Sequence, residues 1–228
     1  MKTVLIAIDE FAKSSNLPIE ILESAGFKIL YNKEGISLDF VKHSEMYRKA
    51  DYVIAGLETY SEDFFQNFGS VKAISRVGVG VDCIDLNSAS NHGVKIFVTS
   101  DRPSVAVAEL CVSNMISLLR HTITMSNDLK RNKWNPIQGK ELRSCTVGVV
   151  GMGSIGKEVV KRVSLLGSKV IGYGSTWNEE FASTYDVDRK TIQEIFKESD
   201  IISIHLPLTS ETKEFIDKNL IDMSKSNA

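Results

Sequence analysis

VGVVGMGSIGKEVV, residues 147–160, decides the fold of the second half of this chain. An apolar run ends in three glycines spaced G-x-G-x-x-G, and an amphipathic, helix-like pattern follows at once. A strand, a glycine turn and a helix in this order are typical of a loop that binds the pyrophosphate of a dinucleotide. Gly151 permits the tight turn, Gly153 lets the backbone approach the phosphates, and Gly156 lets the helix pack closely against the strand.

The helix that follows the glycines supplies the binding groups. Its N-terminus carries partial positive charge and backbone amides that can donate to phosphate oxygens. Ser154 and Ile155 stand at that N-terminus, so their amides are the expected donors. The spacing also occurs in simple turns, but here a strand precedes it, a helix follows, and a second strand comes at the right interval.

The second strand of this region, Lys169–Tyr173, ends without an expected carboxylate. An acid at this point normally binds the two hydroxyls of the adenosine ribose. Here Gly174, Ser175 and Thr176 follow the strand. Nothing at these positions repels a 2′-phosphate, and two hydroxyls could hydrogen-bond to one.

The choice between NAD and NADP therefore stays open. No Arg or Lys follows Thr176 until Arg189, so a phosphate site lacks its usual charged donor nearby. The alternative is a ribose site of low selectivity, served by Glu179 or Glu180 from a shifted loop.

Composition describes an ordinary globular protein. The chain has 228 residues, of which 43% are hydrophobic and 25% charged, with a formal net charge of −2. We expect neither a basic surface that binds nucleic acid nor a segment that spans a membrane. The three cysteines contain no C-x-x-C pair, and no metal site is expected; a reducing cytoplasm is the simplest interpretation.

Short apolar runs alternate with amphipathic segments along the whole chain, which predicts α/β architecture with parallel sheets. Residues 1–100 are expected to form a small doubly wound sheet of about five strands. A hinge is expected near Ser100, and residues 101–228 form a second domain. One long helix is predicted from Val105 to about Lys130, with Cys111, Met115, Leu118 and Leu119 on one face.

A second glycine loop, RVGVGVD, spans Arg76–Asp82 at the end of a predicted strand. The amides of Val77 to Gly80 could form a nest for a small anion, with Arg76 adding positive charge. A plain strand-to-helix turn with a solvated Arg explains the loop equally well.

Three long runs together resemble the D-isomer-specific 2-hydroxyacid dehydrogenase family, the group that includes phosphoglycerate dehydrogenase. They are AISRVGVGVDCIDLNSASNHGVKIFVTSDRPSVAVAEL (73–110), TVGVVGMGSIGKEVVKRVSLLGSKVIGY (146–173) and IISIHLPLTSETKEFID (201–217). The resemblance implies a flavodoxin-like, substrate-binding N-terminal domain followed by an NAD(P)-binding Rossmann domain. It also implies hydride transfer between NAD or NADP and a small 2-oxo acid or D-2-hydroxy acid, and a homodimer formed through the cofactor domain by the long helix and the arm around Trp134.

The family pattern implies roles for individual residues. The amides around Val79 and Gly80, with Gly78 in the same loop, would receive the substrate carboxylate, and Val79 would also lie near the nicotinamide. Val107 would flank the nicotinamide from the long helix. Gly174 stands where the family usually keeps its ribose acid. The adenosine side would be walled by His205, Leu206, Pro207 and Thr212.

The family's catalytic His, Glu and Arg match no position in this sequence. They follow the segment that ends the chain, so the chain is expected to be truncated, to lack the return segment of its first domain, and to be inactive without the rest of the polypeptide. His205 is an alternative proton donor, because His is the usual acid–base residue. The family pattern instead places it in the adenosine wall.

Two functional hypotheses remain. One is an NAD(P)-dependent oxidoreductase of the phosphoglycerate, glycerate or lactate type. The other is a non-catalytic NAD(H)-binding sensor or corepressor-like module, because one fold can serve both purposes.

Overall fold

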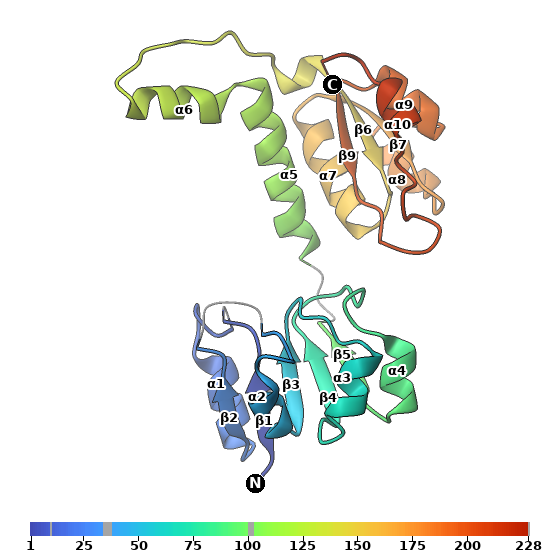
Figure 1. The fold of residues 1–228 in the computed structure, drawn as a ribbon. Coiled ribbons are helices and arrows are strands. Elements are labelled where there is room, and N and C mark those ends of the chain that lie inside the picture. Colours follow the sequence, from blue (N-terminus) through green and yellow to red (C-terminus); the bar gives the residue numbers. More distant parts are fainter. Residues whose placement is uncertain (10, 34–37, 100–102, 228) are drawn as a thin grey trace. The chain divides into compact units, whose positions relative to one another are not determined.

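The computed structural model describes residues 1–9, 11–33, 38–99 and 103–227. The chain divides into two compact units, Met1–Arg102 (unit 1) and Pro103–Ala228 (unit 2). The hinge predicted near Ser100 lies outside the described residues. Figure 1 shows the elements of each unit.

Unit 1 is built on a parallel sheet of five strands in the order β2-β1-β3-β4-β5. This order is the flavodoxin-like one, so the predicted fold class is confirmed. The strands are β1 (Thr3–Ile6), β2 (Lys28–Tyr31), β3 (Tyr52–Ala55), β4 (Ala73–Arg76) and β5 (Lys95–Val98).

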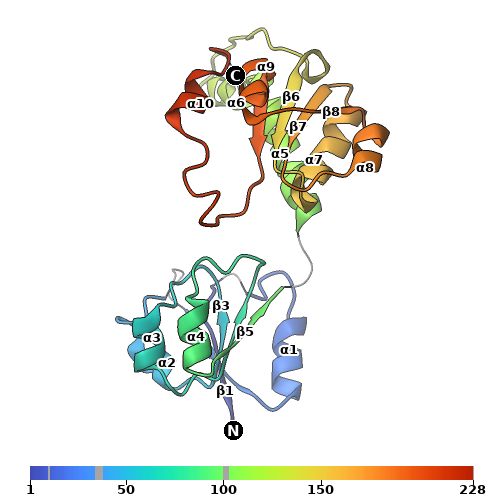
Figure 2. The ribbon, with the colours of Figure 1, turned by 90° about the vertical axis from the view of Figure 1, so that its right-hand side faces the viewer.

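Helices cover both faces of this sheet. They are α1 (Leu17–Ser24), α2 (Ser44–Arg48), α3 (Glu62–Asn67) and α4 (Leu86–Asn91). Helices α2, α3 and α4 lie on one face and α1 on the other (Figure 2). The core beneath α2 and α3 is aromatic: the rings of Tyr47 and Phe64 are fully buried, with centroids 5.4 Å apart.

Unit 2 has a parallel sheet of four strands in the order β8-β7-β6-β9. The strands are β6 (Thr146–Val150), β7 (Lys169–Tyr173), β8 (Val187–Arg189) and β9 (Ile201–Ile204). Four of the five β6 residues are buried, as expected for a central strand covered on both faces. If the strands of unit 2 are numbered from β6 as strand 1, this order is 3-2-1-4. That order belongs to the Rossmann fold and confirms the predicted class of this unit.

Helices of unit 2 cover both faces of its sheet, except for α6. They are α5 (Ser104–Leu119), α6 (Thr122–Lys130), the 3-10 helix η1 (Leu142–Ser144), α7 (Ser154–Leu165), α8 (Glu179–Thr184), α9 (Ile192–Glu198) and α10 (Lys218–Asp222). Helix α7 packs between the sheet and α5, while α9 and α10 cover the opposite face (Figures 1 and 2). Valines of α7 such as Val159 and Val163 are fully buried in this core.

The single helix predicted from Val105 to Lys130 is wrong, because two helices occupy that range. The break falls at His121, whose φ of 51° is left-handed and cannot continue a right-handed helix. The predicted apolar face was also partly wrong: Met115 is buried, but Leu118 is 73% exposed. Helix α6 extends away from the sheet of unit 2 (Figure 1), and none of its residues is buried.

Candidate functional site

The glycine loop connects β6 to α7 and adopts a conformation that needs glycine. Gly151 has a φ of 99°, and its amide donates to the carbonyl of Tyr173 at 2.7 Å. A Cβ at Gly151 would lie 2.5 Å from the carbonyl oxygen of His205. The first glycine is therefore fixed both by its backbone angle and by the close approach of the chain after β9.

The other two glycines have opposite surroundings. A Cβ at Gly156 would overlap the carbonyl group of Gly151, so this glycine lets α7 meet the loop. A Cβ at Gly153 would meet nothing within 4 Å, and the residue is exposed. The loop is thus closed on its inner side and open at Gly153, at the end where α7 begins with Ser154 and Ile155. This form suits a pyrophosphate, which needs backbone amides with no side chain in front of them.

The end of β7 lies beside the glycine loop. A Cβ at Gly174 would lie 3.1 Å from the amide nitrogen of Met152, so the two loops are in close contact. Ser175 and Thr176 are exposed. Glu179, which the sequence offered as a ribose ligand, accepts a hydrogen bond from the Trp177 indole at 3.2 Å.

Trp177 and Arg189 form a pair that was not predicted from the sequence. The Arg189 guanidinium carbon lies 5.3 Å from the centroid of the Trp177 ring, although 12 positions separate the two residues. The only available signal was that β8 had to lie next to β7, which places the end of β8 beside the loop after β7.

The segment after β9 forms a second wall near the glycine loop. The amide of His205 donates to the carbonyl of Val150 at 2.7 Å, which extends the pairing of β9 with β6. Leu206 is half-buried and Pro207 exposed. The Thr212 hydroxyl donates to the carbonyl of Pro207 and accepts from the amide of Thr209 at 2.8 Å. Thr212 therefore fixes the turn that carries the predicted wall.

The surroundings of His205 favour its neutral form. Its Nε2 lies 2.8 Å from the Ser203 hydroxyl, and burial lowers its pKa below the ordinary value. A half-buried imidazole with a lowered pKa suits an apolar wall better than it suits a proton donor at neutral pH.

The second glycine loop, in unit 1, offers fewer amides than the sequence suggested. The Val77 amide donates to the carbonyl of Ala55 at 2.9 Å. The Gly78 amide donates to the Thr99 hydroxyl at 3.0 Å, and the Thr99 amide returns a bond of 3.0 Å to the Gly78 carbonyl. Two of the four amides predicted to form the nest are thus already used.

Val79 and Gly80 remain as the exposed tip of this loop. Val79 is 36% exposed, and a Cβ at Gly80 would meet only the Asp82 carboxylate closely, at 2.7 Å. These are the two residues whose amides were predicted to receive a carboxylate.

Arg76 folds back over the same loop. Its Nη1 donates to the carbonyl of Val77 at 2.7 Å and occupies the space where a side chain at Gly78 would be. Its Nε is buried without a hydrogen-bond partner among the described residues. The guanidinium is therefore fixed close to the loop and keeps an unused donor.

The loop after β3 lies beside this one. The amide of Tyr60 donates to the carbonyl of Cys83 at 2.8 Å, so residues 56–62 are tied to the segment after the glycine loop. Glu58 is buried and accepts from the amide of Gly56 at 2.6 Å. Leu57, by contrast, is 71% exposed and is the apolar side chain that this loop presents.

In unit 2, Val107 lies in the first turn of α5, where it is half-buried and its amide donates to the Pro103 carbonyl at 2.9 Å.

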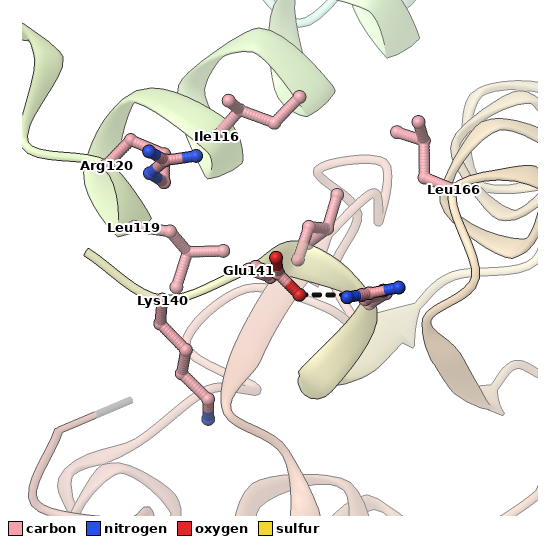
Figure 3. Close-up of a pocket in the computed structure, with 8 residues that line it drawn as sticks. Ile116, Leu119, Arg120, Lys140, Glu141 and Leu166 are labelled. Atoms are coloured by element: carbon pink, nitrogen blue, oxygen red, sulfur yellow. Dashed lines mark hydrogen bonds and ion pairs between the residues drawn. The ribbon is translucent and has the colours of Figure 1, made fainter.

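A separate pocket of about 290 Å³ lies at the C-terminal ends of α5 and α7, opposite the end of α7 that carries the glycine loop (Figure 3). Ile116, Leu119 and Leu166 give it an apolar lining, with Arg120 at its edge. It is not the predicted dinucleotide site.

No helix in the described part of the chain is long and apolar enough to cross a membrane. No group of three or more His, Cys, Asp or Glu side chains among the described residues could hold a metal ion.

Comparison with known proteins gives a family for the chain. Residues 112–228 match the model of the D-isomer specific 2-hydroxyacid dehydrogenase NAD binding domain. Hydroxypyruvate reductase of Thermotoga maritima is 32% identical over 212 residues, which cover 90% of this chain and 68% of that protein. D-3-phosphoglycerate dehydrogenase of Bacillus subtilis is 35% identical over 167 residues, or 72% of this chain. The aligned region spans only 32% of the Bacillus subtilis protein.

Solved structures share the fold. D-lactate dehydrogenase from Escherichia coli, in its apo form, has a TM-score of 0.84 at 22% identity, covering 99% of this chain and 71% of that one. D-lactate dehydrogenase from Aquifex aeolicus, complexed with NAD and lactic acid, has a TM-score of 0.80 at 23% identity, covering 98% and 66%.

Proposed function

The chain belongs to the D-isomer specific 2-hydroxyacid dehydrogenase family, and from that premise we propose that it serves an oxidoreductase that transfers hydride between NAD(P)(H) and a 2-oxo acid or D-2-hydroxy acid. Unit 1 is the acid-binding domain in this proposal, and unit 2 binds the coenzyme.

One observation carries the proposal: the glycine loop is closed at Gly151 and Gly156 and open at Gly153. A turn with only a structural role would need the first two features. It would not need an exposed, uncovered glycine in front of a helix N-terminus. A dinucleotide's pyrophosphate needs all three.

The acid-binding role of unit 1 is supported by the loop after β4. The tip amides of Val79 and Gly80 are the proposed donors to the substrate carboxylate, and the adjacent Arg76 guanidinium adds positive charge. Thr99 fixes Gly78 and so holds the tip in position. Backbone donors fixed in this way bind a carboxylate without first having to be ordered.

The chemistry follows from this arrangement. A bound nicotinamide supplies or accepts the hydride, and the chain's own residues bind and orient. Ser154 and Ile155 hold the pyrophosphate, Val107 flanks the nicotinamide, and His205 lies in the adenosine wall. The exposed Leu57 is proposed to sense the side chain of the acid, which is of the phosphoglycerate, glycerate or lactate type.

A homodimer through unit 2 completes the proposal. Helices α5 and α6 and the arm after them expose large apolar side chains that a monomer would leave in water: Leu110, Ile116, Leu118, Ile123, Leu129 and Trp134. Trp134 alone is 82% exposed. Several large apolar side chains exposed on neighbouring elements are typical of a subunit interface.

The three cysteines, all free in the described structure, fit a reducing cytoplasm.

The direct test is a titration of the 228-residue chain with NADH and NADPH, followed by energy transfer from tryptophan to the reduced nicotinamide. We expect saturable binding of at least one coenzyme. Failure of both to bind at millimolar concentration would contradict the proposal.

The acid site has its own test. Amide NMR shifts of Val79 and Gly80 should move when hydroxypyruvate is added to the coenzyme complex, while the Gly78 amide, already bonded to Thr99, moves less. Shifts confined to other loops would remove unit 1 from the acid-binding role.

A further inference from the structure

The end of β7 has little space for the acid that would select NAD. A Cβ at Gly174 would lie 3.1 Å from the Met152 amide nitrogen and 3.2 Å from the Met152 Cβ, so a side chain there would press against the glycine loop. The next two residues, Ser175 and Thr176, are exposed hydroxyls. At this corner, Gly174, Ser175 and Thr176 themselves carry no negative charge that would repel a phosphate.

A cation reaches the same corner from the neighbouring strand. Arg189 pairs in register with Gly172 on β7. The Trp177 ring rests against that same glycine, with its Cζ3 and Cη2 atoms 3.1 and 3.2 Å from where a Cβ would be. The Arg189 guanidinium lies over this ring, at 5.3 Å from the centroid. Strand pairing therefore supplies the positive charge that the sequence order places 13 residues beyond Thr176.

The two nearby acids, Asp188 and Glu179, bond to other residues and not to the Arg189 guanidinium. Asp188 lies next to it in sequence but faces Lys169, at 3.9 Å. Glu179 accepts from the Trp177 indole nitrogen. Among the described residues no ion pair is formed by Arg189, which is exposed. An exposed guanidinium held over an aromatic ring is well suited to phosphate.

We propose that the corner formed by Ser175, Thr176 and Arg189 binds the 2′-phosphate of NADP(H), and that Arg189, positioned by Trp177, determines this specificity. The proposal rests on the proposed function, because it identifies the coenzyme of the same site. The 2′-phosphate would receive charge-assisted hydrogen bonds from Arg189 and neutral ones from the two hydroxyls.

The test uses fragments that differ only in the phosphate. Calorimetry on the 228-residue chain should show that 2′,5′-ADP binds more tightly than 5′-AMP, and NADPH more tightly than NADH. Arg189→Gln should weaken binding of 2′,5′-ADP and NADPH by about tenfold or more and leave 5′-AMP and NADH unchanged. Arg131→Gln, an exposed arginine at the end of α6, is the matched control and should change none of the four affinities.

Each other outcome counts against the proposal. Tighter binding of NADH than of NADPH by the unaltered chain would overturn it without a variant. An equal loss of all four ligands in Arg189→Gln would mean that Arg189 contacts the adenosine and not the phosphate. Absence of binding by both coenzymes would instead contradict the proposed function itself, so the two failures are distinguishable.

Discussion

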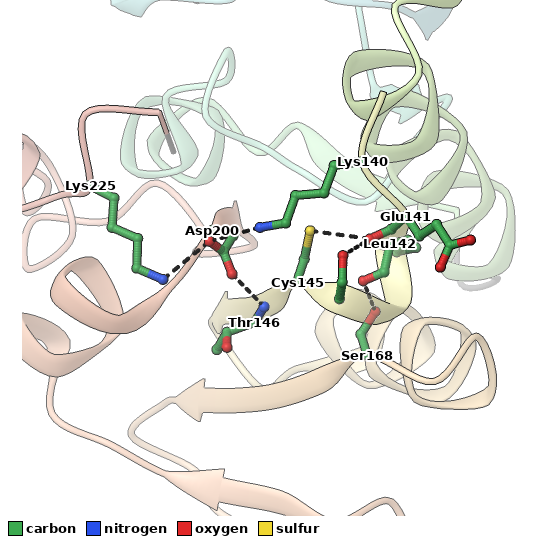
Figure 4. A network of polar contacts seen from close by, with 9 residues as sticks. Lys140, Glu141, Leu142, Cys145, Thr146, Ser168, Asp200 and Lys225 are labelled. Carbon is green, nitrogen blue, oxygen red and sulfur yellow. Dashed lines mark hydrogen bonds and ion pairs between the residues drawn. The ribbon is translucent and has the colours of Figure 1, made fainter. Parts of the chain in front are cut away.

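The carboxylate of Asp200 accepts a hydrogen bond from the backbone amide of Thr146, with 2.8 Å between Oδ2 and the nitrogen (Figure 4). Thr146 begins β6, and Asp200 immediately precedes β9, its parallel neighbour. Unit 1 repeats this arrangement: the amide of Thr3, the first residue of β1, donates at 2.8 Å to Asp51, which precedes β3. In both units an acid caps the start of a neighbouring strand.

Asp200 should contribute to the stability of unit 2. Its Oδ1 also lies 3.2 Å from the Nζ atoms of Lys140 and Lys225. Asp200→Asn removes the charge that these donors share, and we expect the free energy of unfolding to fall by about 1–3 kcal/mol. Both tryptophans of the chain lie in unit 2, so urea unfolding followed by their fluorescence reports on it.

The control for this change is Asp222→Asn, because Asp222 is 58% exposed and its ion pair is with Lys218 of its own helix. It should alter stability by less than about 0.5 kcal/mol. Equal effects of the two substitutions would show that the strand-start contact is not special.

Acid should destabilise unit 2 through the same carboxylate. Burial by itself raises the pKa of Asp200. The Thr146 amide and the two lysines lower the pKa by more than burial raises it, so the net shift is downward. A lowered pKa means that the stabilisation is present above the unfolded value of about 4 and is lost as pH falls through the folded value. Unfolding curves of the unaltered chain and of Asp200→Asn should therefore converge at low pH.

Gly153 and Gly156 should respond to alanine in opposite ways. Gly156→Ala places a methyl group on the Gly151 carbonyl, and we expect a loss of about 1–3 kcal/mol or more in stability. Gly153→Ala meets open space at a φ of −77°, so the protein should fold normally but bind coenzyme more weakly, because the methyl group blocks the phosphates. Thermal unfolding and coenzyme titration separate the two effects. Unchanged coenzyme affinity in Gly153→Ala would exclude this loop as the phosphate site.

His205 should weaken unit 2 at mildly acidic pH. Because burial lowers its pKa, the folded state binds the proton less readily than the unfolded state, whose value is about 6.5. Stability is thus complete above about pH 6.5 and declines as pH falls through the folded value. His205→Asn should show a shallower decline between about pH 7 and pH 5. A titration of the His205 ring by NMR that gave a raised pKa would contradict this reasoning.

The proposed dimer should depend on the apolar surface of α5. Leu118→Glu places a charge on a side chain that is 73% exposed, so it costs the folded subunit little but disrupts an apolar interface. We expect light scattering to show a shift from dimer to monomer. Ile221→Glu on α10, at 57% exposure, is the matched control and should stay dimeric. A monomeric unaltered chain at micromolar concentration would contradict the dimer.

Local patterns in the sequence were enough to predict much of this molecule. Alternating apolar runs and amphipathic segments predicted two parallel α/β sheets, because a buried strand and a half-buried helix differ in their hydrophobic period. The glycine spacing predicted the turn between β6 and α7, because Gly151 needs a positive φ and Gly156 a close approach.

Contacts between distant segments decided the rest. The break at His121, the use of the Gly78 amide by Thr99 and the stacking of Arg189 on Trp177 depend on which surfaces meet. From sequence spacing alone, Arg189 was expected to lie too far from the end of β7 to bind a phosphate there. Pairing of β8 with β7 placed Arg189 beside Gly172, because adjacent parallel strands bring together residues that the intervening helix separates along the chain.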